Sequence, residues 1–310
     1  MEIRGVDDRP MIGVVGLGRM GAPITGTLRR DFPVGVFDTD IDRKRAVPAT
    51  RWFPTLPALA EAVDVLITVL PGPREVSACM ADALPALRPG SLWIDLTSGD
   101  PVVTRDLAEQ SRRLDIDVVS APMGGSVEEA KAGNLIFFVG GQDSAAAKAI
   151  PILRLLSRRD GIRRTGARAE DGQIVKLLAN ALWFANAVAA SEAMLIGQSL
   201  GIPSSDLHAL LRNSAGGSRF LDDDLDKLLE GDYFATFGID RVVEELDTIA
   251  AMSASAGVST PMLDASAALH HQALDRFGPI LGELLAVRLL ETSAGQQLRR
   301  DPAQRGDPRE

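Results

Sequence analysis

Short apolar runs alternate with helix-like stretches through the first half of the chain, and this alternation limits the fold more than any other feature. The runs are almost continuously apolar, as expected of strands that are covered on both faces of a sheet. Helical patterns follow the first four runs at the spacing of strand–helix–strand units. The sequence therefore predicts an α/β fold with a doubly wound Rossmann domain over residues 1–165. The apolar runs cover residues 11–17, 34–38, 64–70, 91–97, 117–122 and 134–141.

The second half of the chain has a different pattern, with no convincing strand after about residue 165. A long helical run covers residues 173–200, and further helices are expected near 204–213, 221–230, 239–256, 261–276 and 280–293. Breaks rich in Gly, Pro and Ser separate them. We predict an all-α domain over residues 166–295, joined to the first domain by the long helix. Residues 296–310 lack apolar periodicity and are predicted to form a disordered tail.

Composition excludes several classes of partner. The formal net charge is -9 and no basic stripe is present, so nucleic acid is a poor partner. The apolar stretch 177–197 contains Asn180, Asn186 and Glu192, which favours a buried helix over a membrane span. We expect a cytoplasmic protein that binds no membrane. We expect no metal site, because the histidines are not spaced with cysteines or carboxylates as metal ligands are. They are His208, His270 and His271.

The segment GLGRMG follows the first apolar run and opens a helical stretch. It fits the pattern G-x-G-x-x-G, in which Gly16 permits a tight turn, Gly18 a close approach of backbone to pyrophosphate, and Gly21 close strand–helix packing. The helix N-terminus would then face anionic phosphates. An ordinary glycine-rich turn is the alternative. We predict that a dinucleotide cofactor binds this loop, which consists of Gly16, Leu17, Gly18, Arg19, Met20 and Gly21.

Asp38 ends the second apolar run, at the distance where an acid contacts the adenosine ribose. Its carboxylate would accept hydrogen bonds from the ribose hydroxyls and repel a 2′-phosphate, which favours NAD over NADP. Arg43, Lys44 and Arg45 follow and offer charge for a 2′-phosphate, although a solvated helix face explains them as well. The sequence favours NAD and leaves NADP open.

The segment IVKLLANAL places Lys176 among apolar residues. Lys176 and Asn180 are four residues apart, so they share one face of a helix, and Gly172 lies one turn earlier. On its own this pattern favours a surface lysine whose stem lies along the helix. A catalytic lysine is the alternative, because apolar surroundings lower the pKa of an amine towards the range useful for proton transfer.

Four ordered segments resemble the β-hydroxyacid dehydrogenases, a family that includes 3-hydroxyisobutyrate dehydrogenase and, more distantly, 6-phosphogluconate dehydrogenase. The resemblance covers residues from about 11 to 290. Its segments are GLGRMGAPI, DLTSGDP (95–101), APMGGSVEEAKAGNL (121–135) and GQIVKLLANAL, with Lys176 and Asn180 matching the family's K-x-x-x-N.

The resemblance implies an NAD(P)-dependent enzyme for a small β-hydroxyacid or its semialdehyde. Lys176 would be the general acid and base, and Asn180 would orient it or the reacting oxygen. Leu70 and Pro71 would flank the nicotinamide ring, with Thr97 also at the cofactor. A homodimer or homotetramer is implied as well. The residues implied to hold the substrate carboxylate are Thr97, Ser98, Gly124, Gly125 and Ser126.

The chain also departs from the family pattern. The lysine of the family's K-D-L segment falls at Glu244, and a glycine of the substrate loop falls at Glu129. Glu244 would disfavour a second carboxylate or a phosphate on the substrate, with Arg241 a candidate for the missing cation, or it faces solvent. Two other functions fit parts of the pattern. They are an imine reductase, although those enzymes generally replace the lysine, and a dinucleotide-binding regulatory module without turnover.

Overall fold

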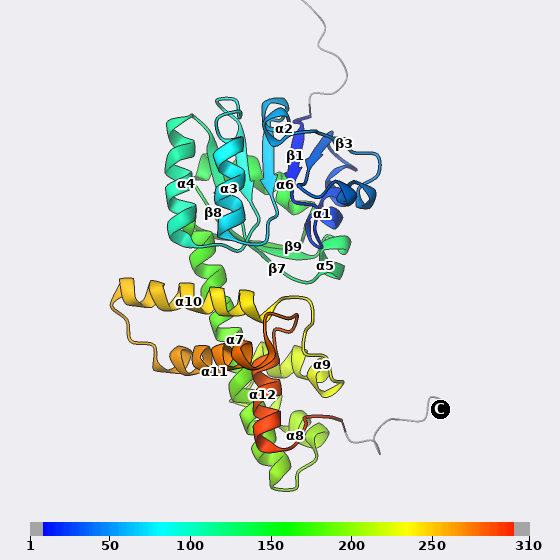
Figure 1. The fold of residues 1–310 in the computed structure, drawn as a ribbon, viewed down its shortest axis with the longest axis vertical. Helices are drawn as coiled ribbons and strands as arrows, with labels where there is room; N and C mark the ends of the chain where they lie inside the picture. Colours follow the sequence, from blue (N-terminus) through cyan, green and yellow to red (C-terminus); the bar gives the residue numbers. More distant parts are fainter. Residues whose placement is uncertain (1–8, 301–310) are drawn as a thin grey trace, which may run out of the picture. The chain divides into compact units, whose positions relative to one another are not determined.

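The computed structural model describes residues 9–300, and the chain forms two compact units, Met1–Lys176 and Leu177–Glu310 (Figure 1). The first unit has an α/β fold built on one sheet, and the second unit is helical. The division falls inside one long helix, eleven residues beyond the predicted boundary at residue 165.

The first unit is built on a sheet with the strand order β3-β2-β1-β4-β5-β6-β8-β7, and β9 pairs with β8. The strands from β3 to β6 are parallel, which the apolar runs predicted. The strands are β1 Ile12–Val15, β2 Val34–Phe37, β3 Arg51–Trp52, β4 Val65–Thr68, β5 Leu92–Asp95, β6 Asp117–Ser120, β7 Met123–Gly124, β8 Leu135–Gly140 and β9 Ser157–Gly166.

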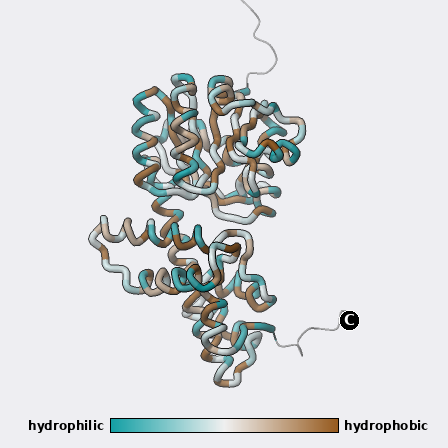
Figure 2. The backbone as a smooth tube through the Cα atoms, viewed as in Figure 1, coloured by the Kyte–Doolittle hydropathy of each residue, from teal (hydrophilic) through white to brown (hydrophobic). Residues whose placement is uncertain are grey.

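Helices cover both faces of this sheet, as the doubly wound fold requires. One apolar core joins the strands to α1 (Gly21–Leu28), α5 (Val127–Ala132) and α6 (Asp143–Arg154). The other core joins them to α2 (Leu56–Ala62), α3 (Pro73–Ala83) and α4 (Pro101–Arg113). A short 3₁₀ helix, Ile41–Ala46, follows β2. Figure 2 colours the strands inside the first unit as largely hydrophobic, which agrees with their burial between the two helical layers.

The sheet differs from the sequence prediction in several features, and the short strands β3 and β7 lie outside the predicted runs. β8 runs antiparallel to β6, so the sheet is not parallel throughout. β9 was not predicted at all, because its sequence SRRDGIRRTG contains a single apolar side chain, Ile162. A strand that pairs only with β8 needs few apolar residues, since much of its surface faces solvent.

In the second unit, residues 177–300 form helices joined by loops, with one isolated bridge between Gly238 and Leu281. Two apolar clusters hold it together, and both include residues of α7. Within the described residues, only α7 has the length and apolar composition of a membrane span, which a core helix of a soluble protein can share. The helices are α7 Glu170–Ser199, α8 Ser204–Leu211, a π-helical turn Phe220–Asp224, α9 Leu225–Leu229, α10 Ile239–Ala256, α11 Pro261–Phe277 and α12 Leu285–Ala294.

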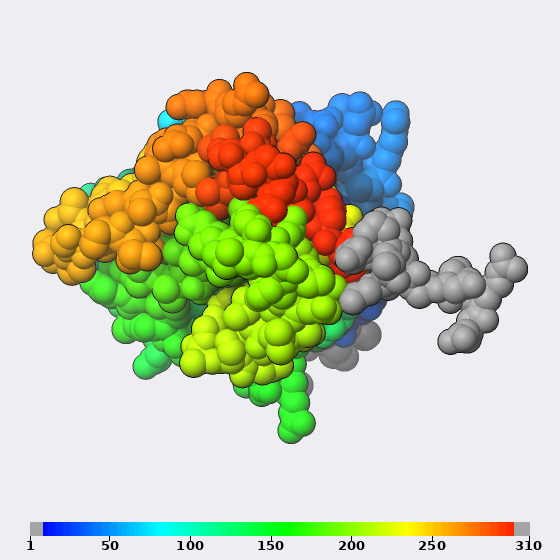
Figure 3. All heavy atoms as spheres, turned by 90° about the horizontal axis from the view of Figure 1, so that it is seen from below, coloured from blue at the N-terminus to red at the C-terminus, as the bar shows by residue number. Residues whose placement is uncertain are grey.

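The start of the predicted tail is packed against this unit. Gln296 Nε2 donates to the Leu195 carbonyl at 3.0 Å, and Leu298 N donates to Glu291 Oε1 at 2.8 Å. Arg300 pairs with Asp226 at 2.6 Å. Figure 3 shows the red C-terminal segment beside the green residues of the same unit. Residues 301–310 of the predicted tail lie outside the described residues.

Candidate active site

The glycine loop connects β1 to α1, and its three glycines meet different surroundings. Gly16 has a φ of +89°, and a Cβ there would lie 2.2 Å from the Val69 carbonyl oxygen. A Cβ on Gly21 would lie 1.9 Å from the Gly16 carbonyl oxygen, so the turn and the helix entry both require glycine. A Cβ on Gly18 would meet nothing within 4 Å. The open space at Gly18 fits a position where a cofactor pyrophosphate approaches the backbone.

The other residues of the loop divide between the core and the surface. Leu17 and Met20 pack inward, and Arg19 is exposed. Leu70, at the end of β4, lies beside the loop, since a Cβ on Gly16 would come within 3.0 Å of Leu70 Cδ2. Pro71 is exposed next to it.

Asp38 holds the glycine loop in place. Its Oδ2 accepts a hydrogen bond from Leu17 N at 2.6 Å, and its Oδ1 accepts one from Asp40 N at 2.9 Å. The nearby cations face solvent in local pairs, Arg43 with Asp40 at 3.3 Å and Arg45 with Asp42 at 3.4 Å. Each carboxylate oxygen has two acceptor positions, so Asp38 can hold the loop and still accept from a ribose hydroxyl.

A buried hydrogen-bond chain joins the ends of β4 and β5. Trp93 Nε1 donates to Thr68 Oγ1, and Thr68 Oγ1 donates to Asp95 Oδ1 at 2.7 Å. Asp95 Oδ1 also accepts from Thr97 N at 3.1 Å. Burial raises the pKa of Asp95 to about 6, while the bonds from Thr68 and Thr97 act in the opposite direction. The sequence analysis assigned no role to Asp95, although a polar residue ending an apolar run was a visible signal.

Thr97 has an internal role in the structure. Its side chain is 2% exposed, and its Oγ1 accepts a hydrogen bond from Leu70 N at 3.0 Å. Thr97 thus fixes the segment after β4 to the segment after β5. Of the two hydroxyl residues in this segment, Thr97 is buried and Ser98 is partly exposed.

The predicted substrate loop is closed by a capping box at the start of α5. Ser126 N donates to Glu129 Oε2 at 2.7 Å, and Glu129 N donates to Ser126 Oγ at 3.2 Å. Gly124 lies in β7, and Gly125 has a φ of +130°, where an added Cβ would lie 2.9 Å from Leu135 Cδ2. The amide of Ser126 therefore already faces a carboxylate, that of Glu129.

The first turn of α7 is fixed to the sheet by Gln173. Its Oε1 accepts from Gly99 N at 2.8 Å, and its Nε2 donates to the Thr97 carbonyl at 2.8 Å and to Ser120 Oγ at 2.9 Å. Gln173 is fully buried. We expected the glycine before it, Gly172, to leave space; instead a Cβ there would lie 2.6 Å from the Phe138 carbonyl oxygen, so the helix touches the sheet backbone.

Lys176 and Asn180 lie one turn apart on α7, and both are partly buried. The apolar neighbours of Lys176 in sequence do not surround it. Leu177 is buried, whereas Val175 and Leu178 are 37% and 44% exposed. A helix turns consecutive side chains about 100° apart, so an apolar run in sequence is not an apolar pocket. The neighbours of Lys176 in the sequence therefore do not form an apolar pocket around it.

Two consecutive glutamates on α10 have different surroundings. Glu244 is half exposed and pairs with Arg241 at 2.8 Å. Glu245 is 9% exposed, and its Oε2 accepts a hydrogen bond from Asn180 Nδ2 at 2.7 Å. The sequence analysis placed weight on Glu244, but Glu245 is the glutamate that contacts a predicted catalytic residue.

No metal centre is formed by the residues that the structure describes. Two of the three histidines are buried within the second unit. His270 Nδ1 donates a hydrogen bond to the Ser266 carbonyl at 2.8 Å, and burial lowers the pKa of the ring. His271 is exposed beside Asp247.

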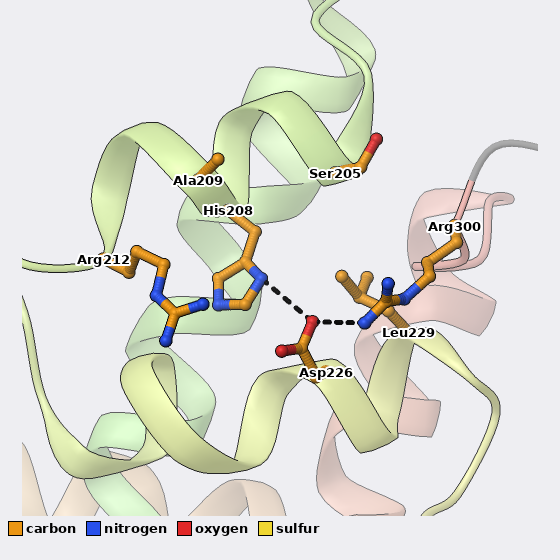
Figure 4. Close-up of a pocket in the computed structure, with 7 residues that line it drawn as sticks. All are labelled: Ser205, His208, Ala209, Arg212, Asp226, Leu229 and Arg300. Atoms are coloured by element: carbon orange, nitrogen blue, oxygen red, sulfur yellow. Dashed lines mark hydrogen bonds and ion pairs between the residues drawn. The ribbon is translucent and has the colours of Figure 1, made fainter. Parts of the chain in front are cut away.

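A cavity of about 230 Å³ lies in the second unit, and Figure 4 shows the residues that line it. His208 Nδ1 lies 3.3 Å from Asp226, and Arg300 lies 2.6 Å from the same carboxylate oxygen. The contact between Arg300 and Asp226 fixes residue 300 to α9. No predicted site residue lines this cavity, whose lining is Ser205, His208, Ala209, Arg212, Asp226, Leu229 and Arg300.

Comparison with known proteins decides the family. Residues 11–166 match the NAD binding domain of 6-phosphogluconate dehydrogenase, and residues 171–290 match the domain described as NAD-binding of NADP-dependent 3-hydroxyisobutyrate dehydrogenase. The chain belongs to the 3-hydroxyisobutyrate dehydrogenase-like β-hydroxyacid dehydrogenases. The first match contains three of the four sequence segments, and the second match contains the segment with Lys176 and Asn180.

Individual relatives of this chain carry different names. Mitochondrial 3-hydroxyisobutyrate dehydrogenase from Homo sapiens is 31% identical over 219 residues, which are 69% of this chain and 64% of that protein. NAD-dependent L-serine dehydrogenase from Pseudomonas aeruginosa is 30% identical over 214 residues, 67% of this chain and 70% of that protein. The solved structure of 3-hydroxyisobutyrate dehydrogenase from Mycobacterium tuberculosis with L-serine has a TM-score of 0.83. It covers 91% of this chain and 99% of that one at 24% identity, which supports the fold alone.

Proposed function

We propose that this chain is a 3-hydroxyacid dehydrogenase or semialdehyde reductase that prefers NAD and uses Lys176 as general acid and base. Two relatives are named for 3-hydroxyisobutyrate and L-serine, which are both small carboxylates with a hydroxyl on the β carbon. The nicotinamide, when bound, accepts or supplies the hydride. The residues of the chain would bind the substrate, orient it and move the hydroxyl proton.

The observation that carries this proposal is the attachment of α7 by Gln173. Three hydrogen bonds from one fully buried side chain hold the helix against Gly99, Thr97 and Ser120. Lys176 lies three residues further along the same helix. A lysine that served only solubility would need no such attachment, whereas proton transfer requires a fixed distance between the amine and the reacting oxygen.

The proton chemistry follows from the residue types. For oxidation, the neutral amine of Lys176 accepts the hydroxyl proton while the hydride leaves the carbon that carries this hydroxyl. For reduction, the ammonium of Lys176 donates a proton to the carbonyl oxygen. Asn180, one turn away, would orient the amine or the reacting oxygen. Ser98 and the loop Gly124–Ser126 would contact the substrate carboxylate. The buried Thr97 would fix the segment that carries Ser98 through its hydrogen bond with Leu70 N.

The preference for NAD is supported by the surroundings of Asp38. A 2′-phosphate would approach a carboxylate that holds the glycine loop, and two of the following arginines already pair with acids. The negative charges of the 2′-phosphate and the Asp38 carboxylate repel each other, which disfavours binding of NADP. Turnover rates with NAD(H) and NADP(H) test this preference, and faster turnover at lower KM with NADP(H) would overturn it.

The experiment that tests the function is a panel of 3-hydroxyacids, including 3-hydroxyisobutyrate and L-serine, and their semialdehydes. Each is assayed with wild type and with Lys176→Ala. We expect the variant to fold and bind cofactor but to lose at least about a hundredfold in kcat, as for loss of a general acid and base. Undiminished turnover in the variant would refute the assignment of Lys176.

We also propose that the chain forms a homo-oligomer through α7. Apolar side chains at steps of four and seven residues form an exposed stripe on α7, which consists of Leu178, Leu182, Ala189 and Ile196. Leu182 and Ile196 are 61% and 62% exposed, and such a stripe is typical of a helix that packs against a second copy. Light scattering on wild type and Leu182→Glu tests this: a wild-type monomer contradicts it.

A further inference from the structure

The amide of Asn180 is held by Glu245, an acid to which the proposed function assigns no role. Glu245 Oε2 and Asn180 Nδ2 are 2.7 Å apart, and both residues belong to the second unit. Glu245 lies among buried apolar residues of α10, close to Val242, Leu246 and Ile249 in helical position. An acid at a nearly buried position is costly unless it is hydrogen-bonded, so packing alone does not explain it.

The chemistry of the two groups fixes the direction of this bond. An ionised carboxylate only accepts hydrogen bonds, so the amide must turn its NH₂ group to Glu245. The carbonyl oxygen Oδ1 is then presented on the other side of the amide. Donation to a negative charge also draws electron density towards Oδ1 and makes it a stronger acceptor.

We propose that Glu245 is a positioning residue that holds Asn180 as an acceptor for the ammonium of Lys176. Lys176 and Asn180 are one turn apart on α7, and the lysine has only donors when charged. An Asn180 turned the other way would offer its NH₂ to the ammonium and repel it. This inference rests on the proposed function, since it assigns Asn180 a task only if Lys176 transfers the proton.

Glu244 provides a matched control, because it is the preceding residue of the same helix and carries the same charge. Glu244 pairs with Arg241 on the exposed side of α10. Among the described residues, no hydrogen bond or ion pair joins its side chain to α7. Glu244→Gln should retain wild-type kcat and KM. Glu245→Ala should lower kcat by between about tenfold and a hundredfold, as for a misplaced catalytic group, with the KM for NAD⁺ unchanged.

The decisive variant exchanges the two groups. In Asn180→Asp combined with Glu245→Gln, the new glutamine donates to the new aspartate, and the second carboxylate oxygen faces the lysine as an acceptor. We expect this double variant to recover much of the kcat that Glu245→Ala and Asn180→Asp each lose. If the NH₂ group of Asn180 were the essential one, the double variant would stay as inactive as the single ones.

The assays use the full chain with NAD⁺ and whichever of 3-hydroxyisobutyrate and L-serine wild type oxidises faster, and thermal unfolding shows that each variant is folded. Wild-type kcat in folded Glu245→Ala, or an exchange variant without recovery, would overturn the role of Glu245 while Lys176→Ala stays inactive. Full activity in Lys176→Ala would instead overturn the proposed function, whatever the Glu245 variants show.

Discussion

Replacing Asp95 by asparagine tests whether a buried charge at the end of β5 lowers the stability of the first unit. Asp95 is 2% exposed, and burial raises its pKa from the ordinary 3.8 to about 6. Because the folded-state pKa lies above the unfolded-state value, folding favours the protonated acid. The resulting stabilisation is complete below pH 3.8 and is lost as the pH rises through about 6.

The size of this effect follows from the two pKa values. A difference of about 2 pKa units corresponds to about 3 kcal/mol between the ionised and the neutral acid. Asparagine is neutral at every pH and retains an acceptor for the Thr68 hydroxyl and the Thr97 amide. We therefore expect Asp95→Asn to raise the free energy of unfolding by up to about 3 kcal/mol at pH 7.5 and by almost nothing at pH 4.

Urea unfolding of wild type and variant at pH 7.5 and pH 4 measures this difference. Tryptophan fluorescence reports on the region, because Trp93 donates a hydrogen bond to Thr68 beside Asp95. Separate transitions of the two units would be fitted separately, and the transition of the first unit is the one compared. A variant that is less stable than wild type by the same amount at both pH values would refute the reasoning, since the difference would then not depend on ionisation of the carboxylate.

Three further perturbations test other parts of the site. Gly21→Ala should destabilise the first unit by about 1–3 kcal/mol because its Cβ meets the Gly16 carbonyl, whereas Gly18→Ala should leave stability unchanged and weaken NAD⁺ binding in calorimetry. Gln173→Leu leaves Gly99 N and the Thr97 carbonyl without their partner, so urea unfolding should show a loss of about 1–3 kcal/mol per group, with kcat lowered as well. Glu129→Gly removes a carboxylate from the substrate loop, so the KM for 3-hydroxyisobutyrate should fall; an unchanged KM would mean that the substrate carboxylate does not approach Ser126.

The fold was predictable because its signals are local. Each central strand is buried on both faces, so its sequence is an unbroken apolar run that a reader can recognise. β9 escaped prediction for the converse reason, since a strand paired on one side with Arg, Asp and Gly in it resembles a loop. The antiparallel direction of β8 was equally hidden, because its sequence LIFFVG is as apolar as those of the parallel strands.

The candidate site was predictable where one short segment contains the whole arrangement. The glycine loop and the helical spacing of Lys176 and Asn180 are of this kind. Asp95 and Gln173 were missed as supporting residues because their partners lie elsewhere in the chain, 74 residues apart in the case of Gly99 and Gln173. Hydrogen bonds between distant segments exist only after the sheet and α7 have packed together.

The two glutamates of α10 show that some of the missing information was nevertheless present in the sequence. An alignment without gaps locates Glu244 and Glu245 but does not say which one faces the core. Helical spacing does, because buried Val242, Leu246 and Ile249 place position 245 on the same face, three residues after 242 and four before 249. Position 244 then points outward, where it meets Arg241. The periodicity of the helix thus assigns the inward contact to Glu245, and only its partner, Asn180, required the folded structure.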